Sequence, residues 1–220
     1  MNNHASQCQS KLPAHEIVYR ELRARVLFGE MAPGEAVTIQ GIAETLNAGI
    51  TPVREAIRRL IAESALVFQD NRRVIVPQLD AAAIEELVTA RNALEPELAR
   101  RAALRADAAA VRQLEAIDAQ LDRAIAGGDV RGYLEQNYRF HDALYAQAAA
   151  PILRSLADGL WLRFGPSLRV VCGQFGTLNL PDRHKELIEA LKTGDADSAA
   201  RAIKRDVEQG MNQVRAALQA

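Results

Sequence analysis

Two short helices joined by a tight turn are predicted over residues 39–62, IQGIAETLNAGITPVREAIRRLIA, and this stretch restricts the possible folds more than any other. Thr51 suits the N-cap of the second helix, and Pro52 suits its first helical position, where a missing N–H costs nothing. Helical spacing then directs four apolar side chains inward. These are Val53, Ile57, Leu60 and Ile61.

The opposite side of the second helix carries Thr51, Arg54 and Arg58, about one turn apart. A helix-turn-helix with hydroxyl and basic residues at the start of its second helix is suited to enter the major groove of DNA. The formal net charge of the whole chain is −1. Nucleic-acid binding must therefore come from a local patch and not from a global field. We expect this stretch to read DNA.

Two short strands are predicted after the helix pair, over residues 66–69 and 74–76, and the turn between them contains Arg72 and Arg73. Such a hairpin is the wing of a winged helix-turn-helix, and a wing typically reaches a phosphate or the adjacent minor groove. A solvated turn is the simpler interpretation of the two arginines. Their position beside the recognition helix favours a DNA contact.

Everything after a short hinge is predicted to be helical, in about six segments separated by Gly, Pro and Asp. Aromatic residues make up only 5% of the chain while Ala and Leu are abundant, which favours helices over sheets. The sequence predicts a mainly α protein: a disordered polar tail at 1–12, a winged helix-turn-helix at 13–77, and an antiparallel all-α, ligand-binding bundle of about six helices at 80–220.

The N-terminus lacks the apolar core of a signal peptide, and no apolar run approaches the roughly 20 residues that span a bilayer. The two cysteines, Cys8 and Cys172, are far apart and have no metal-type spacing. A disulfide framework is therefore not expected. We expect a cytoplasmic protein with no membrane partner.

Five polar residues interrupt the apolar stripes of the bundle helices: Arg91, Asn137, His141, His184 and Asp206. They need partners, because burying an unpaired charge is expensive. Two imidazoles with oxygen ligands suit a divalent transition metal such as zinc, nickel or manganese. Counting Asp206, Arg91 and a divalent ion leaves an excess of about +2. That excess would attract a small carboxylate or dicarboxylate.

Spacing alone leaves a simpler interpretation open. A histidine on an apolar helix face is usually a hydrogen-bonded core residue. An inward-facing Asp206 could also pair with Arg91 and need no metal.

Several motifs occur together in order over residues 13–215. They are GEMAPGE, IAETL and TPVREAIRRL in the first part, and ARNALEPELARRAA, NYRFHDALY and RHKELIEALKTGDADSAARAI in the second. In these motifs the chain resembles the GntR family of bacterial transcription regulators, in the FadR-like branch whose C-terminal effector domain is called FCD. The resemblance implies a homodimer that binds a palindromic DNA operator and responds to a small metabolite.

The resemblance also implies a metal site. Many FCD domains bind a metal through an Asp, a His one turn later, a second His, and a third His 22 residues after that. The matching positions here are Asn137, His141, His184 and Asp206. Two of the four depart from the common pattern, but the net ligand charge is unchanged, which indicates a rearranged site. Arg91 matches an arginine that can bind an effector carboxylate.

On the DNA side, Thr51 and Arg54 match residues that contact the operator in the family, and Gln40 occupies a further contact position that is often basic. The position before Thr51 is commonly an arginine that reaches guanine, whereas this chain has Ile50. One base contact is worth about 1–3 kcal/mol of discrimination. We therefore expect an operator that differs from the common one.

The expected function is a ligand-responsive transcription regulator, most simply a repressor. The alternative is a metal-dependent enzyme, which needs a base beside a metal-bound water. Neither bundle histidine stands in a hydrolase motif such as His-Glu-x-x-His. A purely architectural DNA-binding protein is a third possibility, and the polar cluster argues against it because a plain bundle would have Leu there.

Overall fold

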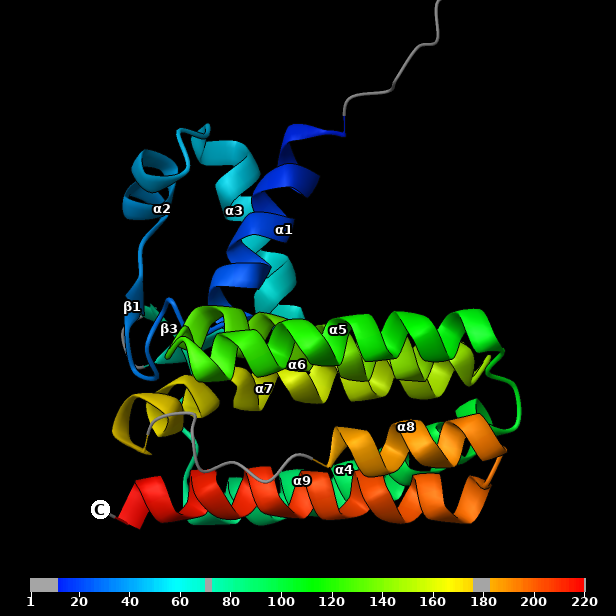
Figure 1. Ribbon diagram of the computed structural model, residues 1–220. Helices are drawn as coiled ribbons and strands as arrows, with labels where there is room; N and C mark the ends of the chain where they lie inside the picture. Colours follow the sequence, from blue (N-terminus) through cyan, green and yellow to red (C-terminus); the bar gives the residue numbers. More distant parts are fainter. Residues whose placement is uncertain (1–11, 70–72, 176–182, 220) are drawn as a thin grey trace, which may run out of the picture.

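The computed structural model describes residues 12–69, 73–175 and 183–219. Almost all of the predicted tail, and Arg72 in the predicted wing, lie outside these ranges. In Figure 1 a small N-terminal part with a sheet rests on one side of a bundle of long helices. The predicted fold class, a winged helix-turn-helix followed by an all-α bundle, is confirmed.

As far as the structure describes it, the N-terminal part contains three helices and a three-stranded antiparallel sheet in the order β1-β3-β2. Strands β2 and β3 form the predicted wing, with Val67 opposite Ile75. Val53 and Leu60 on one helix and Leu22 and Val26 on another are fully buried, so the helices close over a shared core. The elements are α1 (Ala14–Leu27), β1 (Ala36–Val37), α2 (Ile39–Thr45), α3 (Ile50–Ala62), β2 (Val67–Gln69) and β3 (Arg73–Ile75).

The start of α3 differs from the prediction. Gly49, in extended conformation, is the N-cap, and Thr51 is the second helical residue. The first helical bond joins the Val53 N–H to the Gly49 carbonyl at 3.3 Å. The first N–H groups of a helix have no partner within it, so Pro52 is tolerated at the third position as well as at the first. The choice of Thr51 as N-cap was therefore wrong.

Within the described ranges six helices form the bundle, as predicted. Asp80, Asp107 and Asp129 cap the first three, each accepting a hydrogen bond from the backbone N–H three residues later. The helices are α4 (Ala81–Ala103), α5 (Ala108–Ala126), α6 (Val130–Gln147), α7 (Pro151–Phe175), α8 (His184–Thr193) and α9 (Ala196–Gln219). Among the described residues, none of these helices is both long and apolar enough to cross a membrane.

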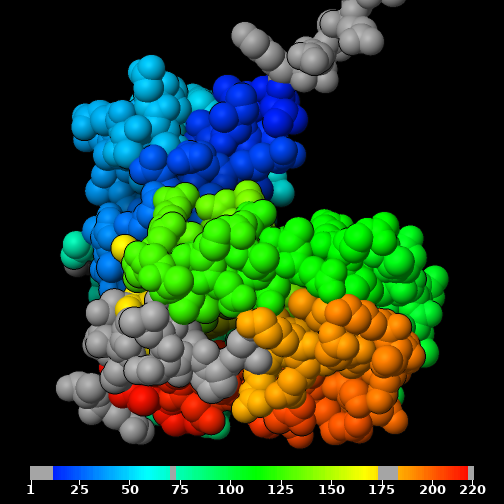
Figure 2. All heavy atoms as spheres, in the orientation of Figure 1, coloured from blue at the N-terminus to red at the C-terminus, as the bar shows by residue number. Residues whose placement is uncertain are grey.

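Helix α7 joins the two parts of the molecule. Figure 2 shows the N-terminal part in direct contact with the bundle. Arg23 of α1 donates to both carboxylate oxygens of Asp158 on α7 at 2.6 Å, and the Tyr138 hydroxyl of α6 donates to the same carboxylate at 2.7 Å. About two turns further along α7, Gly165 approaches the Leu27 carbonyl so closely that a Cβ would collide with it.

We expect Gly165→Ala to lower the free energy of unfolding by about 1–3 kcal/mol, because the added methyl group must push α1 and α7 apart. Gly159→Ala is the matched control on the same helix, since its Cβ would meet nothing within 4 Å. That change should instead stabilise the protein by up to about 1 kcal/mol through helix propensity. Denaturant unfolding of both variants measures the difference, and equal stabilities would refute the close contact.

Candidate functional site

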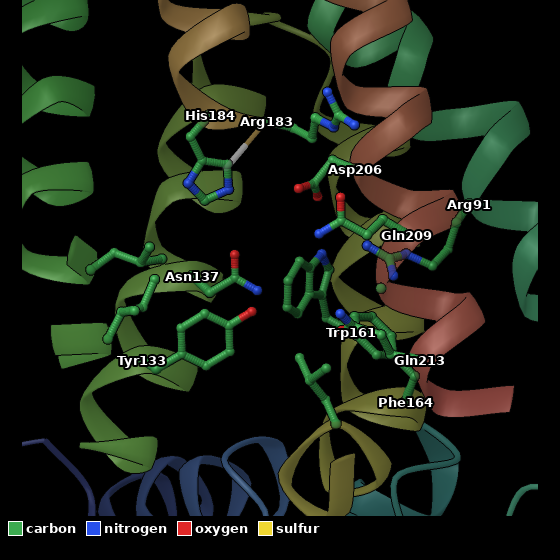
Figure 3. Close-up of a pocket in the computed structure, with 14 residues that line it drawn as sticks. Arg91, Tyr133, Asn137, Trp161, Phe164, Arg183, His184, Asp206, Gln209 and Gln213 are labelled. Atoms are coloured by element: carbon green, nitrogen blue, oxygen red, sulfur yellow. The ribbon is translucent and has the colours of Figure 1, made fainter. Parts of the chain in front are cut away.

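The structure gathers the predicted polar residues in the middle of the bundle. Asn137 and His141 come from α6, His184 is the first residue of α8, and Asp206 comes from α9. One ligand atom each from His141, His184 and Asp206 lie within 4.8 Å of one another. Arg91 of α4 lines the same cavity, and Figure 3 shows it across from Asn137. The four-residue spacing of Asn137 and His141 places both on one face of α6.

A hydrogen-bond chain fixes which nitrogen of His141 carries a proton. The Tyr145 hydroxyl donates to Glu95 at 2.5 Å, so its oxygen must accept from Nδ1 of His141 at 2.9 Å. In the neutral imidazole, Nε2 of His141 then carries the lone pair. This nitrogen is buried and has no hydrogen-bond partner among the described residues. Burial and the nearby Glu95 charge raise the pKa of Tyr145 well above its usual value, so the phenol keeps its proton.

His184 is oriented by a second carboxylate. Its Nδ1 lies 3.0 Å from Oδ1 of Asp118 on α5, and both side chains are buried. A carboxylate only accepts, so Nδ1 carries the proton and Nε2 is the nitrogen left to act as a ligand. The ring of Phe140 stacks on the imidazole with centroids 3.8 Å apart. A histidine that donates to a carboxylate from its other nitrogen is the usual arrangement behind a metal ligand.

Asp206 faces the lone pair of His141. Its Oδ2 is 3.2 Å from Nε2, a distance at which the two groups form an ion pair when the imidazole is protonated. Burial would raise the pKa of Asp206, but the interactions with charged His141, His184 and Arg91 outweigh it and lower the pKa to about 2. The carboxylate is therefore ionised at neutral pH. Two acceptors this close in a protein interior require a cation between them, either a proton or a metal ion.

The ion-pair partner of Arg91 differs from Asp206, the partner considered in the sequence analysis. Arg91 does not form an ion pair with Asp206; its Nε and Nη2 donate to Glu95 at 2.5 and 3.1 Å. The guanidinium also lies over the ring of Phe164, 4.0 Å from the centroid. A guanidinium has five N–H donors, so three remain for a ligand. The side chain therefore lines the cavity with its charge already offset.

The net charge of the cluster is two units lower than the sequence-based expectation. The predicted excess of +2 omitted Glu95 and Asp118, and with these two carboxylates a divalent ion would bring the cluster to neutrality. Without an ion, Arg91 stands against three carboxylates, those of Glu95, Asp118 and Asp206, which leaves an excess of two negative charges. A buried imbalance of this size is costly, and a divalent cation offsets it completely.

The rest of the cavity is lined by Arg183 and by neutral polar, aromatic and aliphatic side chains. Trp161 and Phe164 of α7 form one wall, and the Trp161 indole N–H is buried with no acceptor among the described residues. Tyr133, Gln209 and Gln213 extend the polar lining away from the histidines (Figure 3). The cavity volume is about 50 Å³. This is space for a metal ion and a few water molecules.

Sequence reasoning missed Glu95, Asp118 and Tyr145. Asp118 could have been found by the rule that found the histidines, because it interrupts the apolar stripe that contains Leu114 and Leu121. Glu95 lies one turn after Arg91, a spacing at which ion pairs form within a helix. Tyr145 follows the apolar periodicity of α6, and its hydroxyl gave no separate signal.

The predicted DNA-reading residues within the described ranges are exposed: Gln40, Thr51, Arg54, Arg58 and Arg73. In the described part of the chain, Arg54 and Arg58 form no ion pair. Arg59 on the same helix contrasts with them, because it lies over Tyr19 and pairs with Glu16 and Glu63. The solvent-facing side of α3 therefore presents two cations available to phosphates or bases.

Two family models match the chain. Residues 14–76 match the model described as bacterial regulatory proteins, gntR family, and residues 86–209 match the model described as FCD domain.

The chain is also similar to individual proteins. It is 26% identical over 197 residues to the HTH-type transcriptional regulator McbR of Escherichia coli strain K12, covering 88% of this chain and 89% of McbR. It is 24% identical over 214 residues to the HTH-type transcriptional repressor RspR of the same strain, covering 96% and 92% of the two chains. The solved structure of E. coli McbR/YncC matches with a TM-score of 0.87 at 24% identity, covering 94% of this chain and 99% of the other. That structure supports the fold.

We expect Asp118→Asn to weaken divalent-metal binding about 10–100-fold, because His184 loses the charged acceptor that orients it. Asp122→Asn is the control one turn away on α5, where the carboxylate is exposed and pairs only with Lys185 among the described residues. It should leave metal affinity unchanged. Titration of the metal-free protein with Zn²⁺ or Ni²⁺ measures both, and equal affinities in the two variants would argue against a role for Asp118.

Proposed function

The chain belongs to the GntR family of bacterial regulatory proteins, with an FCD domain after its DNA-binding part, and we propose that a small organic acid bound at a divalent metal controls it. The family and the relatives make it a DNA-binding transcription regulator and not an enzyme. The single observation that supports metal control is the pair of facing acceptors, Nε2 of the buried His141 and Oδ2 of the partly buried Asp206, 3.2 Å apart.

In this proposal His141, His184 and Asp206 bind the ion, with the amide oxygen of Asn137 as a fourth ligand. Zinc, nickel and manganese all suit two imidazoles with oxygen ligands. A divalent ion held there supplies open coordination positions for a carboxylate oxygen. Charge neutrality of the cluster and the orientation of both histidines support this assignment.

The effector would also meet hydrogen-bond donors of the chain itself. Arg91 retains three N–H groups beyond those that pair with Glu95, and the buried Trp161 N–H lacks an acceptor within the part of the chain that the structure describes. Both suit the oxygens of a carboxylate. The sequence had suggested that an excess of positive charge attracts the anion, but the cluster has no such excess. These donors and the metal would bind the anion instead.

Control would act through α7. The cavity is too small for most organic acids, so an effector would enter only if a wall moves. Trp161 and Phe164 of α7 form such a wall, and Asp158 on the same helix binds Arg23 of α1. A shift of α7 would therefore change the placement of the DNA-reading part.

The regulator would function in the cytoplasm as a homodimer and a repressor on a palindromic operator. Two recognition helices must lie about 34–36 Å apart to enter successive major grooves, so a small rotation of each part suffices to weaken binding. Residues 13–77 would form the DNA-binding unit and residues 80–220 the effector unit. Gln40, Thr51, Arg54 and Arg58, with Arg72 and Arg73 of the wing, would contact the DNA.

We expect Arg54→Ala to abolish the gel shift of a short palindrome found near the protein's own gene, because it removes the main base-reading cation of α3. Arg101→Ala, an exposed arginine on α4, is the control and should bind normally. Intact binding by Arg54→Ala would remove this residue from the readout.

We expect metal analysis of the purified protein to find about one divalent transition metal per chain, and mass spectrometry of the same sample to identify an organic acid. A chelator should lower the melting temperature, because the cluster regains its excess negative charge. The His184→Ala variant should have this lower melting temperature even without the chelator. No bound metal, together with no effect of the chelator on stability or anion binding, would end the metal proposal.

Asp158→Asn tests whether the contact between α7 and α1 couples the cavity to DNA binding. Because Asp158 contacts α1 and not the cavity, metal affinity should equal that of the wild type. Removal of the metal should change the operator affinity of this variant less than it changes that of the wild type. Fluorescence anisotropy with labelled operator measures it, and an unchanged response would exclude this contact from the coupling.

A further inference from the structure

The first residue of the recognition helix is an exposed aliphatic side chain. Ile50 begins α3 and is 44% exposed, whereas Val53, Ile57 and Leu60 of the same helix are at most 5% exposed. Ile50 is also absent from the partly buried side chains that pack against the core, such as Leu46 and Ile61. It therefore contributes little to the folded N-terminal part.

Ile50 is aligned with the residues that face DNA. Ile50, Arg54 and Arg58 follow one another at spacings of four, so they lie one turn apart along one edge of α3. All three are exposed. The N-terminal residues of a recognition helix are the ones that reach base edges in the major groove. The exposed edge with Arg54 and Arg58 therefore begins with the branched hydrocarbon side chain of Ile50, at the end of the helix that enters the groove.

The chemistry of that tip restricts what it can recognise. An isoleucine side chain has no hydrogen-bond donor or acceptor, so it cannot read guanine as an arginine in this position would. The apolar group that a base edge offers in the major groove is the C5-methyl group of thymine. We propose that Ile50 is a specificity-determining residue that selects thymine in each half of the operator through contact with this methyl group.

This inference rests on the proposed DNA-reading role of α3 and adds a base identity to it. One helical turn rises 5.4 Å, and base pairs are spaced about 3.4 Å apart along DNA. The selected thymine should therefore lie within one or two base pairs of the base that Arg54 contacts. Removing its methyl group loses the burial of about one CH₂ equivalent, which corresponds to roughly a fourfold loss in affinity per half-site.

The test uses the full-length protein. A random duplex library is enriched for bound sequences, and each thymine of the resulting operator is then replaced by deoxyuridine, which removes only the methyl group. Replacement of one symmetric pair of thymines should weaken binding roughly tenfold or more. Ile50→Ala should bind the thymine and uracil duplexes equally. Ile17→Ala, an exposed isoleucine on α1, is the control and should keep the difference.

A second variant should change which base the protein prefers. Ile50→Arg should enrich guanine at the position where the wild-type protein enriches thymine, since arginine binds O6 and N7 of guanine. An operator in which no thymine is sensitive to uracil would overturn the inference, as would a sensitivity that persists in Ile50→Ala. Both results leave the proposed DNA binding intact. Failure of the wild-type protein to enrich any sequence would instead overturn the proposed function together with this inference.

Discussion

Carboxylates that lie inside the helical bundle without enough positive partners are the constraint on which the bundle depends. Glu95, Asp118 and Asp206 come from three different helices, and Arg91 offsets only the first. Tyr145 and the two histidines connect the carboxylates into hydrogen-bonded chains, and these chains orient both imidazoles toward one point. The bundle is thus organised around a place for a cation, and packing of its apolar stripes alone would not need these groups.

Helix α7 both forms a wall of the cavity and contacts the N-terminal, DNA-reading part. Trp161 lies against His141 on one side, with ring centroids 4.9 Å apart, and against Tyr138 on the other, at 5.6 Å. Tyr138 in turn contacts Phe28 at the end of α1 and hydrogen-bonds Asp158. A continuous series of packed rings therefore connects the cavity with the N-terminal part, which gives the proposed control a physical route.

Sequence reasoning was accurate where one residue and its near neighbours decide the outcome. Aspartates were expected to separate the bundle helices, and Asp80, Asp107 and Asp129 each accept a backbone hydrogen bond at the start of a helix. It failed at Thr51, because a proline is compatible with several positions in the first turn and the nearby Gly49 was overlooked. The predicted positive excess at the cavity was also wrong, because Asp118 approaches His184 from a helix 66 residues away.

The sequence by itself determined the helices, the winged helix-turn-helix and the short set of polar residues that belong inside the bundle, because periodicity and capping are local properties of the chain. Only the tertiary structure decided how those residues pair. The partner of Arg91, the protonated nitrogen of each histidine and the balance of charge depend on which side chains converge from separate helices. The free energy of a buried charge is set by its neighbours in space, and spacing along the chain does not report them.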